Sequence, residues 1–334
     1  MALWADRASF LIVAAALWIV MTQGMLAGLL CAALAFLTTR ALGRYLLAWT
    51  RLGPSAALQI STAFVVLAPL SLIFLVWTRA RGLVLDAPAQ YRELLHFLST
   101  TILELREKLP PGLGELLPDG VEEIQKRLAA YLGGKAGTLA HASRAWLEGL
   151  LFAYVGLIIG ALAAVRPKLD TTRLKPLAAA MHVRLTRFGI TFRQIVVAQF
   201  WIAGFNTLLT TAFVALILPL WSVHLPYRPA LITFTFLAGL IPIVGNLMCN
   251  LVLTIVGLSV SPITALACLV FLILIHKGEY FINAKVIGRS THMGVWELLA
   301  VMFTLEAIFG PAGLVAAPLF YAYLKRELEA AGWI

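Results

Sequence analysis

The chain has 334 residues, of which 61% are hydrophobic and only 13% charged, a composition that excludes an ordinary soluble domain and predicts a polytopic membrane protein. The formal net charge is +10, but most of the basic surplus lies in short segments beside apolar runs, so we expect membrane orientation rather than a nucleic-acid partner. The three cysteines lie inside apolar runs without disulfide or metal spacing, and we expect no cofactor.

The first apolar run covers residues 9–37 and contains a polar notch at Thr22-Gln23-Gly24. As one helix the run would measure about 43 Å, longer than a bilayer core requires. We therefore expect two short antiparallel helices that turn at the notch. This turn puts the flanking basic residues on the cytoplasmic side: Arg7, Arg40, Arg44 and Arg51.

Residues 55–78, with a kink at Pro69, complete an N-terminal region of transmembrane spans, residues 1–78. Residues 79–148 differ because they hold nine basic and nine acidic side chains. A balanced loop carries no cytoplasmic signal, and the parity of the spans puts it outside. We expect a small extracytoplasmic helical segment, as a cap on the membrane part or as a docking surface for a partner.

The C-terminal transmembrane region, residues 149–334, begins with a span at 149–165. The following segment, 166–193, is rich in basic residues and has Asp170 as its single acidic residue, which predicts a cytoplasmic position. Its leucines share one helical face and its arginines another, so we expect an amphipathic helix at the membrane surface or beneath the bundle. It fits an interfacial strut or a gate that couples to movement. The arginines in question are Arg173, Arg184 and Arg187.

Residues 195–218 form the next span and carry several polar side chains, among them Gln199 and Asn206. Amides that face lipid cost free energy, so these side chains should face other helices. They fit either interhelical contacts or part of a transport path. The loop at 219–229 then lies outside, with Trp221 and Tyr227 at the interface.

Two later apolar runs, 231–258 and 296–324, are each interrupted by a Pro/Gly-bearing break. Each arm has about 11–14 residues, or roughly 16–21 Å of helix, whereas the hydrocarbon core is about 30 Å thick. The runs are therefore either kinked, overlong spans or re-entrant hairpins. Broken helices at membrane depth occur where they are buried in protein or line a wet cavity, as at transporter sites.

The basic residues near 277–289 distinguish these two arrangements. If 231–258 is a hairpin, the span at 261–282 runs inward and leaves Lys277, Lys285 and Arg289 in the cytoplasm. The kinked alternative leaves them outside, so the positive-inside rule favours hairpins. The predicted fold is an all-α, polytopic transmembrane bundle with two re-entrant hairpins and both termini in the cytoplasm.

Two oppositely inserted hairpins whose tips meet near the bilayer midplane would form a central site. Backbone N–H groups freed at the breaks, helped by positive helix ends, are the first candidates for binding polar or anionic groups. Amide side chains beside the first break and on the preceding span add donors and acceptors. The candidate residues are Pro242, Gly245, Asn246, Asn250, Asn206, Gly310, Pro311 and Gly313.

Two carboxylates, Glu297 and Glu306, lie nine residues apart on the first arm of the second hairpin and therefore point in opposite directions. Glu306, next to the break, is the better candidate for the site, because an intramembrane carboxylate is a functional candidate by default. A structural hydrogen bond or ion pair is the alternative. A second group of residues is expected in gating or anchoring: Glu279, Asn283, Lys285 and Glu297.

Three C-terminal stretches carry a resemblance to a known family: "IPIVGN" at 241–246, "HKGEYFINAKVIG" at 276–288 and "WELLAVMFTLEAIFGPAGLVAAPLFYAYLKREL" at 296–328. With the layout of spans before them, the chain resembles the autoinducer-2 exporter family of bacterial membrane transporters over nearly its whole length. Many members differ at Asn246, Ala284 and Trp296-Glu297, so the chain resembles a divergent branch. The resemblance implies a bacterial inner-membrane protein and a homo-oligomer, pentamers being described for members.

The resemblance also implies export of a small hydrophilic signal molecule, and some relatives are assigned cation/proton antiport. We therefore expect a secondary transporter that exports a small polar metabolite or signal molecule. The first alternative is a sodium- or proton-coupled cation antiporter in which Glu306 carries the ion. The second is a non-transporting membrane scaffold that uses residues 79–148 for docking.

An enzyme is not expected. The six histidines are scattered, without a His/Cys/carboxylate cluster at ligand spacing, and no serine lies in a Gly-x-Ser-x-Gly setting. The "GGKAGT" at 133–138 lacks the full spacing of a phosphate loop. Without a nucleotide-binding motif, the driving force is expected to be an ion gradient or the gradient of the solute.

Overall fold

The computed structural model describes residues 2–75, 77–78, 126, 144, 146–166, 171–240, 244–286 and 294–334. In these ranges every regular element is a helix, which confirms the all-α fold class. The chain divides into two compact units, one formed by Met1–Leu26 with Lys168–Ile334 and the other by Ala27–Pro167. Nearly all of the predicted extracytoplasmic segment, 79–148, lies outside the described residues.

The polar notch near residue 23 separates two helices, as predicted. Helix α1 (Ala2–Thr22) ends there and α2 (Leu26–Trp49) follows, with Gly24 between them at a φ of +66°. The prediction of short helices is wrong, because α1 has 21 residues and α2 has 24, each long enough to cross a membrane alone. No proline interrupts either helix, so both extend into their flanks. The antiparallel packing of the pair stays a prediction.

The second unit contains α2 and two further apolar helices, Pro54–Leu75 and Trp146–Val165. Glycines bring α2 and the 146–165 helix together, since a Cβ on Gly156 would lie 2.0 Å from the Gly28 carbonyl oxygen. A Cβ on Gly160 would likewise lie 1.9 Å from the Ala32 oxygen, so the two helices run parallel. This is the small-residue packing typical of membrane helices.

The 54–75 helix runs antiparallel to the 146–165 helix. The Thr62 hydroxyl lies 3.5 Å from the Ala161 carbonyl oxygen, and the Tyr154 hydroxyl lies 3.4 Å from that of Val66. The cytoplasmic ends predicted from charge therefore fall at one end of this unit, where the Arg40 side chain donates to the Arg166 carbonyl oxygen.

The longest element of the first unit joins two segments that the sequence predicted separately. Helix α6 (Pro176–Ala212) continues through a π-helical stretch, η2 (Phe213–Ile217), into α7 (Leu218–Leu220). The expectation of a distinct surface helix before a span at 195–218 is wrong. No proline lies between Pro176 and Pro219 to end the helix. The 45 residues from Pro176 to Leu220 measure about 68 Å, more than the thickness of a bilayer core.

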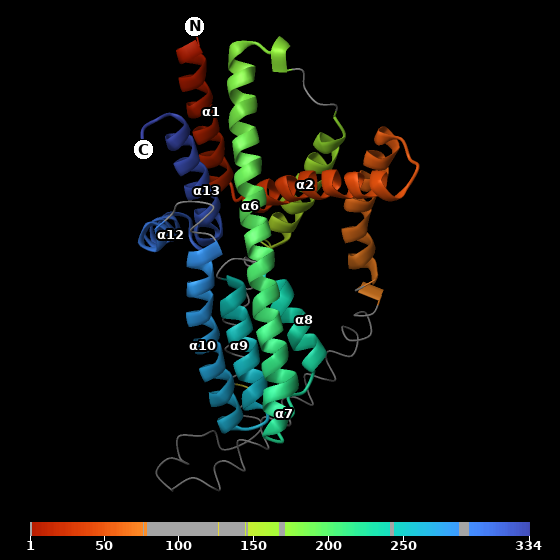
Figure 1. The fold of residues 1–334 in the computed structure, drawn as a ribbon, viewed down its shortest axis with the longest axis vertical. Helices are drawn as coiled ribbons and strands as arrows, with labels where there is room; N and C mark the ends of the chain where they lie inside the picture. The colour runs from red at the N-terminus through yellow and green to blue at the C-terminus, as the bar shows by residue number, and fades with distance from the viewer. Residues whose placement is uncertain are drawn as a thin grey trace. The chain divides into compact units, whose positions relative to one another are not determined.

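Helix α6 is the axis of the first unit (Figure 1). Its first half packs against α1 and α13 (Pro311–Ala330), and its second half against α8 (Arg228–Gly239) and α10 (Pro262–Val286). A hydrophobic core fills the second half, where the rings of Phe213 and Phe271 stack at 3.9 Å. The buried members of this core are Phe213, Val214, Leu218, Leu225, Leu231, Leu253, Cys268 and Leu272.

Both broken runs fold back on themselves as helical hairpins. Helix α8 packs antiparallel to α9 (Val244–Leu258), and α12 (Val295–Phe309) packs antiparallel to α13. A kinked continuous span cannot bring its two arms side by side, so the alternative of overlong spans does not hold for this fold. Insertion of the hairpins into a bilayer from opposite faces stays a prediction.

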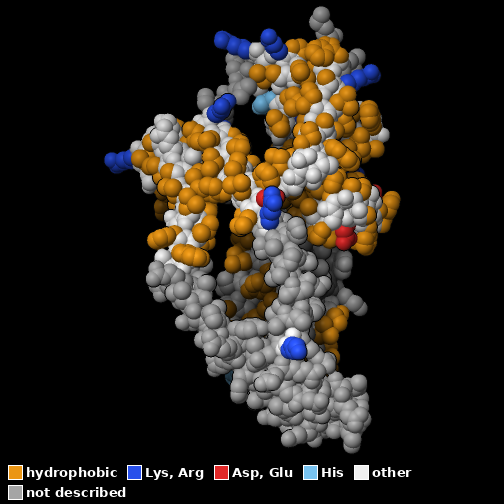
Figure 2. Space-filling model, turned by 180° about the vertical axis from the view of Figure 1, so that it is seen from behind, with side chains coloured by type: hydrophobic (Ala, Val, Ile, Leu, Met, Phe, Trp, Pro, Cys, Tyr) orange, Lys and Arg blue, Asp and Glu red, His pale blue; other side chains and the backbone are white. Residues whose placement is uncertain are grey.

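Helix α10 extends four residues beyond the predicted span and ends at Val286. The predicted cytoplasmic loop at 277–289 is therefore mostly helix, with Lys277 and Lys285 in its last turns. The exposed surface of the described helices is largely apolar, as Figure 2 shows for one face. An apolar surface over helices of this length is what a bilayer solvates.

Candidate functional site

The tip of the first hairpin depends on a glycine. Gly245 is buried, and a Cβ at this position would lie 1.8 Å from the Ala238 carbonyl oxygen. No side chain fits there, so Gly245 allows the end of α8 and the start of α9 to touch backbone to backbone. Further from the tip, the Cys249 thiol lies 3.8 Å from the Thr235 carbonyl oxygen. Pro242 and the side chain of Asn246 lie outside the described residues.

An amide on α6 holds this tip. The Gln199 side chain donates a hydrogen bond of 2.6 Å to the carbonyl oxygen of Gly239, the last residue of α8. Terminal carbonyls of a helix lack partners within the helix, so this bond satisfies one that would otherwise be orphaned. Ala203 packs one turn further along α6, where a Cβ on Gly239 would meet the Ala203 Cβ at 3.3 Å. The prediction that Gln199 faces another helix is confirmed.

Polar side chains continue along the same face of α6. Asn206 follows Gln199 by seven residues, which returns to the same side of the helix, and it is 7% exposed. Thr210 follows one turn later and is also buried. Across the hairpin, Asn250 of α9 has a buried amide oxygen without a hydrogen-bond partner in the described part of the chain. A buried acceptor of this kind is costly unless a water or a solute satisfies it.

The tip of the second hairpin is a single residue. Gly310 separates α12 from α13 and has φ 64° and ψ −150°, a region that only glycine visits readily. Pro311 is the first residue of α13, where its lack of an N–H costs nothing. Gly313 is buried, and a Cβ there would lie 2.0 Å from the Leu305 carbonyl oxygen.

The expectation of free backbone donors at this second break is wrong for two of its residues. The Gly310 N–H donates to the Glu306 carbonyl oxygen at 2.7 Å, and the Gly313 N–H donates to the Gly310 oxygen at 2.8 Å. The turn closes on itself because the end of α12 needs these donors for its last carbonyls. Binding of a solute at this tip would therefore rely on other groups.

Substitution of Gly310 by alanine is expected to destabilise the protein by about 1–3 kcal/mol, because a Cβ disfavours the backbone conformation there. Thermal unfolding of the purified protein in detergent measures this change. Gly189→Ala is the matched control, because Gly189 lies within α6 with no neighbour near its missing Cβ, so alanine should be neutral or stabilising. Equal unfolding temperatures for the two variants would contradict the assignment of strain to Gly310.

Side-chain contacts define how the C-terminal part of α13 is aligned along α6. Arg184 pairs with Glu327, and the Phe188 and Tyr323 rings lie 5.4 Å apart, so four residues forward on α6 correspond to four back on α13. Pro318 lies within α13, so this register describes only the C-terminal part of that helix, from Tyr323 to Glu327. Gln199 forms a hydrogen bond to the first tip, so the first break lies near the middle of the 176–220 helical segment.

The two carboxylates of α12 have different surroundings. Glu297 accepts hydrogen bonds from the Tyr321 hydroxyl at 2.7 Å and from the Lys325 ammonium at 3.1 Å, both on α13. These bonds join the open ends of the hairpin arms. Glu306 is exposed on an apolar helix. The remaining residues of the predicted gating group (Glu279, Asn283 and Lys285) lie in the C-terminal part of α10, and their side chains are outside the described residues.

A buried ionic cluster, which we call the α1–α6–α13 junction, was not predicted. Arg184 is 5% exposed and donates to the Glu327 carboxylate, to the Asp6 carboxylate at 2.7 Å and to the Ser9 hydroxyl at 2.6 Å. Arg187 adds a second bond to Glu327, at 2.9 Å. Glu327 is 2% exposed, so the Arg184–Glu327 pair is buried, while Asp6 joins the cluster from an exposed position on α1.

One arginine and one leucine at this junction lie opposite to the arrangement expected from the predicted faces, although Phe188 of the apolar face does pack against Tyr323. Arg184, expected on an outward polar face, is buried, whereas Leu185, expected on the covered apolar face, is 60% exposed. The physical reason is that Glu327 offers a buried charge partner, with Asp6 adding a second carboxylate from an exposed position, while the outer face contacts an apolar environment. The signal in the sequence was the presence of acidic residues near both ends of the chain, Asp6 at one end and Glu327 at the other.

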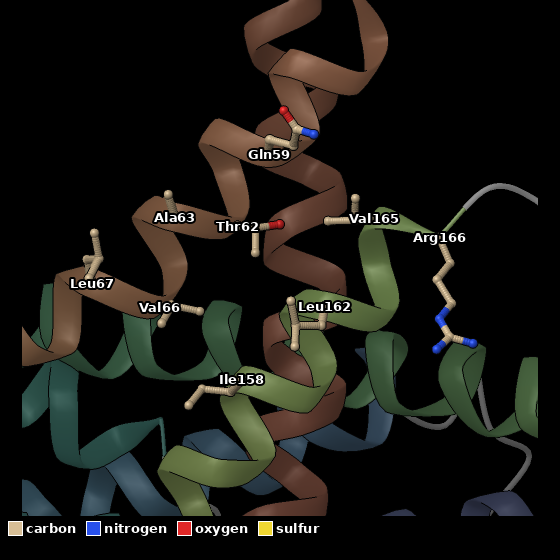
Figure 3. Close-up of a pocket in the computed structure, with 9 residues that line it drawn as sticks. All are labelled: Gln59, Thr62, Ala63, Val66, Leu67, Ile158, Leu162, Val165 and Arg166. Atoms are coloured by element: carbon tan, nitrogen blue, oxygen red, sulfur yellow. The ribbon is translucent and has the colours of Figure 1, made fainter.

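A groove lies elsewhere, in the second unit between the 54–75 and 146–165 helices (Figure 3). It has a volume of about 910 Å³ and an apolar lining, with Gln59, Thr62 and Arg166 as its polar members. None of the residues predicted for the site lines it.

Comparison with known proteins gives one family and one relative of interest. The model of the AI-2E family transporter matches residues 8–332. The protein "Putative transport protein YdbI" of Bacillus subtilis (strain 168) is 29% identical over 164 residues, which cover 48% of this chain and 45% of that protein. The aligned part is thus less than half of either protein. No solved structure matches the chain.

Proposed function

Because this chain belongs to the AI-2E transporter family, we propose that it is a secondary membrane transporter that exports a small polar metabolite or signal molecule. The solute class follows from the groups near the tips, which are amides rather than clustered charges. Asn206 and Asn250 carry both donors and acceptors, and the oxygen of Asn250 is buried without a partner among the described residues.

One observation carries this proposal: the chain has two helical hairpins whose arms meet in close backbone contact at glycines beside their tips. Helices that break at membrane depth require protein or a wet cavity around the break, and transporters bind solutes at such places. Gly245 and Gly313 bring the arms of each hairpin into backbone contact, so each hairpin is a compact body. In our proposal, movement of the hairpin-bearing unit against the other spans exposes the site to each side in turn.

The proposed setting is the cytoplasmic membrane of a bacterium, with both chain termini in the cytoplasm. The N- and C-termini lie at the same end of the first unit as the start of α6 (Figure 1). That end includes Arg173 and Lys175, and the positive-inside rule assigns it to the cytoplasm. The α8–α9 hairpin would then enter from outside and the α12–α13 hairpin from inside.

A cation/proton antiporter is the second candidate, and the exposure of Glu306 favours it. A carboxylate on the lipid side of an apolar helix is costly, so Glu306 should face a wet cavity or a second copy of the chain. The neighbouring Phe303 is 67% exposed, which fits a homo-oligomer in which α12 is covered. Either setting would allow Glu306 to bind a proton or sodium ion during transport.

Flux through proteoliposomes distinguishes the two candidates. Efflux of a polar solute that is independent of sodium and proton gradients supports the exporter. Dissipation of a preset pH gradient on addition of sodium supports the antiporter. Absence of both, across a panel of polar solutes and of sodium and potassium, would contradict the proposal of transport.

Glu306→Gln is expected to lower the flux at least about tenfold, equivalent to about 1.4 kcal/mol. In the antiporter the amide cannot carry a proton or hold a cation, and in the exporter it loses the charged acceptor that hydrogen-bonds a polar solute most strongly. Membrane insertion should remain unchanged, since the substitution removes a charge from an apolar helix. Initial rates in proteoliposomes with equal protein content measure the effect. Glu329→Gln, an exposed acidic residue at the end of α13, is the control and should transport normally. Normal flux through Glu306→Gln would remove Glu306 from the site.

A further inference from the structure

The groove between the 54–75 and 146–165 helices has a polar end and an apolar floor (Figure 3). Gln59 and Arg166 come from the end of each helix that lies near the basic loop regions. Ala63, Leu67 and Ile158 line the part further along. The Arg166 side chain points away from the apolar lining (Figure 3).

The polar end is strongly cationic. The Arg40 side chain donates to the Arg166 carbonyl oxygen at 3.2 Å, and Arg44 follows one turn later on α2. The Arg40 Nε is buried and has no hydrogen-bond partner among the described residues. The only carboxylate described in this unit is Glu148, which pairs with Arg144 at the opposite end of the 146–165 helix. The arginines near the groove therefore have no described counter-charge.

The helix lengths set the height of this cationic end in a bilayer. The 54–75 helix has 22 residues and the 146–165 helix has 20, or about 33 and 30 Å, which matches the hydrocarbon thickness. Two exposed tryptophans, Trp77 and Trp146, lie at the ends of these helices that are far from the arginines. The groove thus begins at the headgroup level of one leaflet, beside arginines, and continues into the depth of that leaflet.

We propose that this groove is a binding site for an anionic phospholipid of the leaflet on the arginine side. An acyl chain lies along Ala63, Leu67 and Ile158, and the phosphate accepts hydrogen bonds from the Arg166 and Arg40 guanidinium groups. The lipid supplies the negative charge that the described residues around the groove lack. This site is separate from the hairpin tips, and it depends on the embedding of the helix pair in a membrane rather than on the transported solute.

Native mass spectrometry of the purified full-length protein, titrated with phosphatidylglycerol or phosphatidylcholine, tests this site. The wild type should bind phosphatidylglycerol more tightly. Arg40→Gln and Arg166→Gln should each weaken that binding about fivefold, and leave phosphatidylcholine unaffected, because each arginine near a membrane surface contributes a similar attraction to anionic lipid. Ala63→Phe, a substitution at an exposed position, should weaken binding of both lipids by filling the groove.

Arg144→Gln is the control, because Arg144 is an exposed arginine at the far end of the same helix. Equal loss of binding in Arg144→Gln and Arg166→Gln would show attraction without a site and would overturn the proposal. Equal affinity of the wild type for the two lipids would also overturn it. If Ala63→Phe left lipid binding intact but dissociated an assembly of protein copies, the groove would belong to a subunit interface, and the lipid assignment would fail.

Discussion

Glu327→Gln is expected to lower the free energy of unfolding by about 3–5 kcal/mol, because it leaves two arginines of the α1–α6–α13 junction without the buried carboxylate they share. Glu327 is 2% exposed, so water cannot take over its hydrogen bonds to Arg184 and Arg187. Chemical or thermal unfolding in detergent micelles measures the change. We expect it to be among the largest effects of any single polar substitution, because α1, α6 and α13 meet at this carboxylate.

A double-mutant cycle separates the interaction energy of Arg184 with Glu327 from the other effects of each substitution. Arg184→Gln combined with Glu327→Gln should cost clearly less than the sum of the two single changes, because the second change removes a charge that the first has already left unpaired. The same cycle on Arg144 and Glu148 is the matched control, and its coupling should be below about 0.5 kcal/mol, since both side chains are exposed. Additive effects at Arg184 and Glu327 would contradict a coupled buried pair.

The second large effect is expected at the first hairpin. Gly245→Ala puts a Cβ 1.8 Å from the Ala238 carbonyl oxygen, a contact that no side-chain rotation can relieve because the neighbour is backbone. The arms of the α8–α9 hairpin must then separate, which should cost about 2–3 kcal/mol of stability. Separation also moves Gly239 away from the Gln199 amide, so solute flux should fall with stability.

Unfolding and proteoliposome flux, measured on the same preparation of Gly245→Ala, test this expectation. Gly204→Ala is the control, because Gly204 lies on α6 with no neighbour near its missing Cβ and should tolerate alanine with normal flux. Gly313→Ala should behave like Gly245→Ala, since its Cβ would lie 2.0 Å from the Leu305 carbonyl oxygen. Wild-type stability and flux for both hairpin variants would contradict a role for close backbone packing at the tips.

Local patterns in the sequence were sufficient to predict the helices and most of their breaks. The breaks before α2 and between α12 and α13 occur at Gly24 and Gly310, both with positive φ, where glycine ends helices without steric cost. Charge near residues 277–289 indicated hairpins rather than kinked spans, and the fold has hairpins although those residues are largely helical. These features depend on a few neighbouring residues, so periodicity and turn chemistry describe them well.

The sequence by itself determined an all-helical chain with apolar helices, an excess of basic charge near their predicted cytoplasmic ends and two breaks rich in glycine and proline. Only the tertiary structure decided which way the faces of α6 point, with Arg184 inward and Leu185 outward, and which residues share a site. The reason is that the residues packing against a helix decide which of its faces is buried. Asp6 and Glu327 are 178 and 143 residues away from Arg184 along the chain, and a local sequence pattern does not predict contacts over such separations.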